Sequence, residues 1–500
     1  MPKSGGILKY PSTIYPTGFD PHRRPSYLPF ASIPVFNNLV RYDPTKAETS
    51  PATIQGDLAE RWTFTPDGKS WTFNLRRGVK WHDGQPFTAD DVIYNLDKLA
   101  DPKRSLQAGA FPAYQRSEKV NDLTVKVYLS RPQPSFLANL AGGYSVFVAP
   151  QAGDKFQSTD FLIGTGPFKF KSYTSGVSLS FVKNTEYFKK GLPYLDGVNY
   201  YIIVDRSAQT DALITKRIDM TNALSGIANK ETLDRIASQA PEVHVAWGRQ
   251  NPQVIWFNTK RKPLDDVRVR KALALVTDMK AAVIGGFGAE NFRDPTVAIM
   301  PPAYGLPRSE VEKILGWDKP MDQRLAEAKA LLKEAGLEGG FKLEYVCWTV
   351  PELSRFAQVI ADYYRRTLNV DVKLTPLPYA EADKRKKAGE YDIYADGLST
   401  MVNDPDEVVG DFKTGSPSNF AFWSNAEVDR LATAQSVETD LSKRVQICQQ
   451  IERLILSEVP VIPQGALPLA SGWQPYVKGF VMQNVAYGSG QRFEYVWLDK

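Results

Sequence analysis

Apolar and polar residues alternate over 58–75 in the manner of a β-hairpin with one aromatic face. The short apolar run 62–64 is interrupted by Pro-Asp-Gly at 66–68, which is a turn sequence. After this turn, the run 71–75 places aromatic and aliphatic residues at every second position. Two such runs on either side of a turn predict a pair of antiparallel strands.

The hairpin is followed by the start of a helix. A second turn, His-Asp-Gly at 82–84, leads to Thr88 and Asp91, which form a variant capping box because the Thr88 side chain can bond the Asp91 amide. Acidic residues in the first turn also favour a helix N-terminus. Apolar residues recur at helical spacing over 92–99, and the Asp-Pro pair at 101–102 ends the predicted helix.

Further along the chain, strands and helices alternate. This order predicts a β-α-β-α-β unit with a largely parallel sheet. Its strands are expected at 341–348, 370–374 and 391–395, and its helices at 322–335, 352–368 and 379–388. Elsewhere the pattern predicts strands over 120–129, 178–183, 198–204, 254–258 and 493–498, and helices over 135–140, 206–216, 428–435 and 441–456.

Length and charge narrow the class of protein. A chain of 500 residues is longer than one hydrophobic core usually serves, so two or three domains are expected. The net charge of +5 is small for this length, and the densest basic run, 384–387, is interpreted as a solvated helix face. Nucleic acid is therefore not an expected partner. No apolar run approaches the length of a membrane span.

Four consecutive motifs lie within residues 58–92. They are L-A-x-x-W at 58–62, W-T-F-x-L-R at 71–76, W-x-D-G at 81–84 and P-x-T-A-x-D-V at 86–92. In this order and spacing they resemble the signature region of the extracytoplasmic solute receptors of ABC importers, family 5, which include oligopeptide-, dipeptide- and nickel-binding proteins. Further matches at 163–170 and 266–273 extend the resemblance over almost the whole chain.

The resemblance implies an α/β fold with two lobes. This is the type II (cluster C) fold of periplasmic binding proteins, with an extra subdomain in the first lobe. A ligand would bind in the crevice between the lobes, where closure expels water and makes a few polar groups decisive. The expected division is 1–42 for lobe I, 43–165 for its extra subdomain, 166–258 for lobe I, 259–475 for lobe II and 476–500 for the C-terminal part of lobe I.

Ligand-binding positions follow from the same resemblance. They fall at the rim of lobe I, before the strand that crosses between the lobes, and in loops of lobe II. The loop after strand 391–395 has the strongest support, because the C-terminal ends of strands in α/β sheets host ligands. Each aromatic residue could instead serve in packing. The expected residues are Tyr15, Pro16, Asn222, Gln250, Pro252, Gln253, Trp348, Tyr379, Leu398, Ser399, Met401, Asn403 and Tyr487.

One position departs from the pattern of the peptide-binding members. Those proteins place an Asp in the loop that aligns with 398–405, where it pairs with the α-ammonium group of the peptide. With Gly397 and the Asp-Pro pair at 404–405 aligned, this position is Met401 in the present chain. A buried ammonium group without a counter-charge is costly.

A peptide with a free N-terminus is therefore not expected unless Asp396, Asp404 or Asp406 substitutes for the missing carboxylate. A less charged solute, whether aromatic, sugar-like or amidated, fits Trp348, Tyr379 and Met401 better.

Catalytic and metal-binding chemistry have no positive support. The three histidines, His22, His82 and His244, each lack a second His or Cys at ligand spacing. Asp-Pro-Asp at 404–406 is a poor calcium loop, because Val409 occupies the position that needs Gly. No catalytic residue, metal or cofactor is expected. A secreted hydrolase on a large α/β scaffold is the alternative, and a chaperone or chemosensory role would use the same fold.

The expected partners are a small or peptide-like solute and the permease subunits of an ABC importer, with the receptor itself a monomer. The expected location is the periplasm, or the outer face of the membrane for a lipoprotein. Residues 1–6 lack the apolar segment of a signal peptide, so an exported protein would be the mature form with an added Met1. Cys347 and Cys448 are interpreted as buried free thiols, with a disulfide as the alternative.

Overall fold

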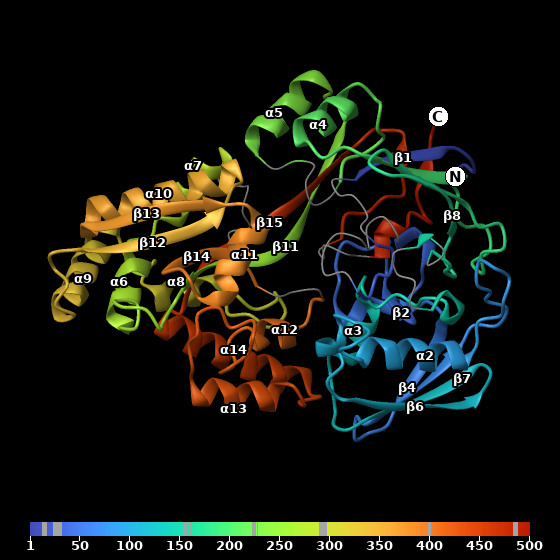
Figure 1. Cartoon of the computed structure of the whole chain (residues 1–500), viewed down its shortest axis with the longest axis horizontal. Coiled ribbons are helices and arrows are strands. Elements are labelled where there is room, and N and C mark those ends of the chain that lie inside the picture. The colour runs from blue at the N-terminus through green and yellow to red at the C-terminus, as the bar shows by residue number, and fades with distance from the viewer. Residues whose placement is uncertain are drawn as a thin grey trace.

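Two long antiparallel strands, β11 (His244–Phe257) and β15 (Val461–Trp473), cross between the two lobes of the computed structural model (Figure 1). Lobe I lies on the right of Figure 1 and carries both ends of the chain, while lobe II lies on the left. The structure describes residues 1–12, 18–23, 33–153, 158–159, 162–222, 227, 229–289, 298–398, 402–483 and 489–500, with the backbone alone at 249–251, 467–469 and 489–490.

Lobe II is built on a mixed sheet with the strand order β13-β12-β14-β11-β15. β12 runs parallel to β13 and β14, whereas β11 runs antiparallel to β14 and β15. The predicted β-α-β-α-β unit and its parallel strands are therefore confirmed. Its elements are β12 (Phe341–Trp348), α10 (Pro351–Leu368), β13 (Val370–Leu377), α11 (Tyr379–Ala388) and β14 (Ile393–Gly397).

Helices cover both faces of this sheet, because successive residues of its strands point to opposite sides. Ile255 and Phe257 of β11 pack in one apolar core, while Trp256 between them packs in the other. The helices on the first face include α6 (Val267–Val276), α7 (Met279–Phe287), α8 (Arg308–Leu315), α9 (Met321–Glu334) and α10. Those on the second include α11, α12 (Pro405–Gly410), α13 (Ala426–Gln435) and α14 (Leu441–Glu458).

Lobe I contains two four-stranded sheets with separate apolar cores, besides two short two-stranded sheets. One has the order β1-β10-β9-β8, and the other the order β4-β5-β7-β6 with α2 and α3 beside it. The elements are β1 (Ile7–Ser12), β2 (Val40–Tyr42), β3 (Ile54–Gly56), β4 (Ala59–Phe64), β5 (Ser70–Leu75), α2 (Ala89–Ala100), β6 (Tyr114–Asn121), β7 (Thr124–Leu129), α3 (Phe136–Ala141), β8 (Phe168–Thr174), β9 (Ser178–Lys183), β10 (Gly197–Ile202), β16 (Val477–Lys478) and β17 (Trp497–Leu498). Two further helices, α4 (Arg206–Ile214) and α5 (Lys230–Gln239), lie beside the crossing strands. The residue boundaries of the lobes stay a prediction.

The signature region folds as its sequence predicts. β4 and β5 form the antiparallel hairpin, and α2 begins at Ala89 with the Asp91 carboxylate accepting the Thr88 N–H at 2.7 Å. Nε2 of His82 lies 3.0 Å from the Gly166 carbonyl oxygen, which joins this region to the segment 163–170. Gly164 must be glycine, because a side chain there would overlap the carbonyl oxygen of Val35.

Three predictions need correction. The strand expected at 120–129 is a hairpin of β6 and β7, because the Asn121 side chain accepts the Leu123 N–H at 2.9 Å and turns the chain. The strand expected at 493–498 is reduced to β17, since Phe493 has φ +58° and starts a turn. The basic run 384–387 is not wholly solvated, because Lys386 is buried and ion-paired.

Both cysteines are buried and free, so the interpretation of Cys347 and Cys448 as buried thiols is confirmed. In the part of the chain that the structure describes, no helix combines the length and the apolar character needed to cross a membrane.

Candidate binding site between the lobes

The residues expected before the crossing strand and after β14 lie next to each other. Gln253 of β11 is paired in register with Gly397 at the end of β14. The Leu398 N–H donates to the Pro252 carbonyl oxygen at 2.8 Å. The structure therefore joins two segments that are far apart in the sequence where β11 crosses between the lobes.

An aromatic pair stands at the C-terminal edge of the parallel strands. Trp348 is the last residue of β12, and Tyr379 is the first residue of α11. Their rings meet edge to face, with centroids 5.1 Å apart and planes at 83°. The Trp348 indole N–H donates to the Tyr394 hydroxyl at 2.8 Å, which fixes the indole orientation. Tyr379 is 56% exposed, so its ring can contact a ligand as well as its neighbour.

Asn222 lies beside the other crossing strand. Met220 forms an isolated bridge with Trp473 of β15, and the Thr221 N–H donates to the Gly472 carbonyl oxygen at 2.8 Å. These bonds hold the buried Asn222 against the end of β15 that adjoins lobe I.

Two residues of the loop after β14, Leu398 and Asn403, contact other parts of the protein. Leu398 is buried in the apolar core that contains Trp256 and Tyr394. The Asn403 side-chain amide donates to the carbonyl oxygen of Thr49 at 2.6 Å, so it joins lobe II to lobe I. Tyr15, Pro16, Ser399, Met401 and Tyr487 lie outside the described residues, and for Gln250 only the backbone position in β11 is described.

The carboxylates that could replace the missing Asp already have cationic or hydrogen-bonding partners. Asp396 accepts a bond of 2.6 Å from Lys386; burial raises the pKa of Asp396, and this ion pair opposes the rise. Asp404 forms a two-point ion pair with Arg444, with both distances 2.8 Å. Burial alone would lower the pKa of Arg444, but Asp404 raises it well above its ordinary value. The residues considered as a poor calcium loop are thus part of an arginine-centred network.

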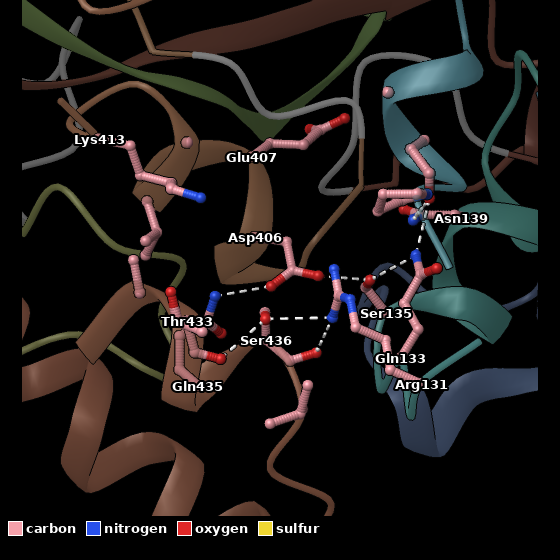
Figure 2. Close-up of a pocket in the computed structure, with 17 residues that line it drawn as sticks. Arg131, Gln133, Ser135, Asn139, Asp406, Glu407, Lys413, Thr433, Gln435 and Ser436 are labelled. Carbon is pink, nitrogen blue, oxygen red and sulfur yellow. Dashed lines mark hydrogen bonds between the residues drawn. The ribbon is translucent and has the colours of Figure 1, made fainter. Parts of the chain in front are cut away.

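A polar contact between the lobes was missed by sequence reasoning. Asp406 accepts hydrogen bonds from Ser135 of lobe I at 2.5 Å and from Gln435 of lobe II at 2.7 Å. Arg131 of lobe I donates to the carbonyl and hydroxyl oxygens of Ser436, both at 3.2 Å. Figure 2 shows these residues around a cavity of about 350 Å³. No periodicity or motif links residues so distant in the sequence.

Metal ligands and reactive thiols were the two kinds of catalytic group to consider in the described part of the chain. Among the residues described, no group of three or more His, Cys, Asp or Glu side chains could hold a metal ion. Burial raises the pKa of Cys347, and it raises the pKa of Cys448 to about 12, so neither thiol is a ready nucleophile. The arrangement is suited to enclosing a ligand between two surfaces.

Comparison with known proteins gives a consistent result. The model of the bacterial extracellular solute-binding proteins, family 5, matches residues 53–420. Heme-binding protein A of Haemophilus influenzae is 30% identical over 498 residues, covering 91% of this chain and 85% of that protein. The dipeptide-binding protein of Escherichia coli is 28% identical over 520 residues, covering 95% and 92%.

A solved structure agrees with this match over the full length. The binding protein MoaA of A. tumefaciens R10, in complex with mannopinic acid, superposes with a TM-score of 0.78 at 26% identity, covering 100% of both chains. The two-lobed type II fold of periplasmic binding proteins is therefore confirmed.

Proposed function

The chain belongs to the bacterial extracellular solute-binding proteins of family 5, and we propose that it binds a small solute without a free α-ammonium group and returns it unchanged. As a member of this family it is a solute receptor that delivers its ligand to an ABC importer. The observation that carries the proposal is the ion pairing of Asp396, Asp404 and Asp406, the three carboxylates considered as replacements for the Asp of the peptide-binding members.

The electrostatic support comes from Asp396, Asp404 and Asp406. Each has a cationic partner within lobe II: Lys386 for Asp396 and Arg444 for the other two. A ligand ammonium would have to compete with these preformed pairs, and a buried ammonium group without a counter-ion is unfavourable. The expected ligand segments 13–17, 399–401 and 484–488, which lie outside the described residues, contain no Asp or Glu in their sequence.

The aromatic support comes from Trp348 and Tyr379. An edge-to-face pair at the end of a sheet offers one ring face to a planar or sugar-like group, and its geometry is fixed by the Tyr394 hydroxyl. Relatives named for heme, dipeptides and mannopinic acid show that the family accommodates very different solutes. The aromatic pair therefore favours an aromatic, sugar-like or amidated solute over a charged one.

The remaining parts of the proposal concern partners and place. Permease subunits of an ABC importer receive the solute, the receptor acts as a monomer, and it works in the periplasm or as a lipoprotein outside the membrane. The ligand site combines the segments around 15–16, 222, 250–253, 348, 379, 398–403 and 487. The lobe division 1–42, 43–165, 166–258, 259–475 and 476–500 belongs to the same proposal.

The test compares two matched compounds by isothermal titration calorimetry: the dipeptide Ala-Phe and its N-acetylated, C-amidated form. We expect the blocked form to bind at least about tenfold more tightly, because it carries no ammonium group. Tighter binding of the free dipeptide would overturn the choice of solute. Recovery of a hydrolysed compound after incubation would instead support the secreted-hydrolase alternative.

A second arm of the test probes the aromatic pair. Tyr379→Ala removes an exposed ring, so the lobe should keep its stability while binding of the blocked dipeptide weakens about five- to tenfold. Leu441→Ala is the matched control, since Leu441 is a similarly exposed apolar residue at the start of α14. Equal effects of the two substitutions would exclude Tyr379 from the site.

A further inference from the structure

Polar contacts between the lobes lie away from the expected solute site. They join Arg131 to Ser436 and Ser135 to Asp406. We propose that these contacts form a latch that holds the lobes closed and so sets the affinity for the solute without touching it. The inference rests on the proposed function only in assuming that closure encloses a ligand.

Contacts within lobe II alone hold its side of the latch in position. Oδ1 of Asp406 accepts bonds from Gln435 at 2.7 Å and from Arg444 at 3.2 Å, which leaves Oδ2 directed at Ser135. Arg444 is itself fixed by its two-point pair with Asp404. A preorganised acceptor loses little conformational freedom when the latch forms, so more of the bond energy favours closure.

The lobe I side is equally fixed. Ser135 is fully buried, and its hydroxyl also accepts a bond of 3.1 Å from Gln133. It lies immediately before α3, whose side chains pack in the core of the β4-β5-β7-β6 sheet. The two halves of the latch thus belong to different apolar cores and move with different lobes.

Arg131 adds an electrostatic component. Ser436 is the C-terminal cap of α13, so its carbonyl oxygen lies at the negative end of that helix. The Arg131 guanidinium approaches this end from the other lobe and donates to both oxygens of Ser436. A cation at a helix C-terminus is favourable, and this interaction exists only while the lobes are together.

The position of the latch makes it effective. In Figure 1, α3 and α12 meet below the crossing strands β11 and β15, on the side away from α4 and α5. The latch therefore lies at a distance from the strands about which the lobes would turn. Contacts made only in the closed form shift the equilibrium toward it, and the apparent affinity for a ligand follows the closed fraction.

The composition of the contact surface suits reversible closure. The cavity beside the latch is lined by polar side chains, including Arg131, Asn139, Glu407 and Lys413 in Figure 2, as well as by apolar residues. Separation of such a surface returns polar groups to water and does not expose an apolar core. At one point the packing is close: a side chain on Gly142 of lobe I would come within 2.9 Å of Val402 of lobe II.

The test measures the distance between the lobes by electron–electron double resonance. Spin labels on Thr63→Cys and Lys443→Cys report the two lobes, and the native thiols are buried and so protected from labelling. Ser135→Ala and Arg131→Ala each remove latch bonds, while Gly142→Val adds a wedge between the lobes. Arg116→Ala is the control, because this exposed arginine of β6 contacts Glu118 and Tyr128 of its own lobe.

We expect the open-to-closed ratio to rise about fivefold for Ser135→Ala, as for the loss of one hydrogen bond, to rise by at least that factor for Arg131→Ala and Gly142→Val, and to stay unchanged in the control. A solute that co-purifies with the protein, followed by native mass spectrometry after dilution, should leave the variants faster by the same factor. Circular dichroism checks that each variant is folded. Unchanged distances in Ser135→Ala, Arg131→Ala and Gly142→Val would overturn the latch. Altered distances with no solute retained by any form would leave the latch standing and count against the proposed function.

Discussion

Each lobe contains a buried glutamate, and the two have opposite surroundings. In lobe I, Glu494 pairs with Arg41, lies 3.4 Å from Nζ of Lys189 and accepts the hydroxyl of Tyr187. In lobe II, Glu452 of α14 accepts the backbone N–H groups of residues 299, 300 and 306, at 2.6, 3.4 and 2.7 Å.

The two carboxyl groups therefore titrate in opposite directions. Burial works against the charged form of both. The cations Arg41 and Lys189 outweigh burial and lower the pKa of Glu494 to about 2. Burial outweighs the backbone N–H groups and raises the pKa of Glu452 to about 7. Burial alone therefore does not determine whether a carboxyl group is ionised; the charge of its hydrogen-bond donors does.

The difference follows from how each lobe is assembled. Lobe I must hold together segments from distant parts of the chain, and Asp57 does so by pairing with Lys189 at 2.6 Å and Arg492 at 2.7 Å. The resulting network joins residues near 40–57, 187–189 and 492–494. Lobe II gathers most of its sheet from one stretch of chain with two large apolar cores. Its buried Glu452 has a local task, which is to fix the loop 298–306.

Removal of Asp57 should have the largest effect, because it takes a carboxylate out of the buried ion-pair network of lobe I. Asp57→Ala leaves Arg41, Lys189 and Arg492 to share the carboxylate of Glu494, so we expect lobe I to lose about 3–5 kcal/mol of stability. Hydrogen exchange at pH 7 should show faster exchange in lobe I and little change in lobe II. Asp90→Ala, at a 66% exposed partner of Lys119, is the control. Equal loss of protection in both lobes would contradict the conclusion that the Asp57 network stabilises lobe I alone.

Acid should weaken lobe I through His82. Burial lowers the pKa of His82 to about 4, and its Nδ1 accepts the Gly164 N–H at 3.3 Å, a bond that only the neutral ring can make. Because the unfolded ring binds a proton near pH 6.5, stability present above that pH is lost as pH falls toward 4, by about 3 kcal/mol.

The measurement is hydrogen exchange of residues 79–87 between pH 7 and pH 4, corrected for intrinsic exchange rates. His82→Gln cannot be protonated, so its protection should be lower than wild type at pH 7 but should depend less on pH. If protection in His82→Gln falls with pH as steeply as in wild type, groups other than His82 cause the acid sensitivity.

Local structure was predictable because it depends on neighbours in the sequence. The ranges expected for β12 and α11 are those observed, and the capping box at Thr88 forms as predicted. The hairpin of β6 and β7 was hidden because alternation continues through its turn, where an Asn side chain replaces a turn motif.

The site was predictable only in part. Trp348 and Tyr379 meet, as do the segments around Gln253 and Leu398, because each lies at an end of an element whose position follows from the fold. The latch could not be predicted, because Arg131 and Ser436 lie 305 residues apart and neither belongs to a recognisable sequence motif. Lys386 was also mispredicted. It lies in a basic run typical of a solvated helix face, and only the fold places Asp396 of β14 beside it.

Glu452→Gln tests the titration of the buried glutamate in lobe II. The folded pKa of about 7 lies above the unfolded value, so Glu452 contributes stability below pH 4.5 that is lost as pH rises through 7. Glutamine removes this dependence. At pH 8 we expect a net change of only about 1 kcal/mol, because relief of a buried charge offsets the loss of one acceptor for the loop N–H groups. Urea unfolding at pH 5 and pH 8 measures both effects, and a variant that keeps the wild-type slope would move the titration away from Glu452.

The smallest effects are expected at exposed ion pairs, which occur in both lobes. Lys119 in lobe I lies 2.7 Å from Asp90, and Arg430 in lobe II lies 2.6 Å from Glu427, distances as short as those in the Asp57 network. Solvent screens such pairs, and ordering two long side chains cancels much of the attraction. Lys119→Ala and Arg430→Ala should therefore leave the urea midpoint of the protein unchanged at low and high salt. If either substitution approached the effect of Asp57→Ala, ion-pair distance would matter more than burial, and the contrast between Glu494 and Glu452 would need another cause.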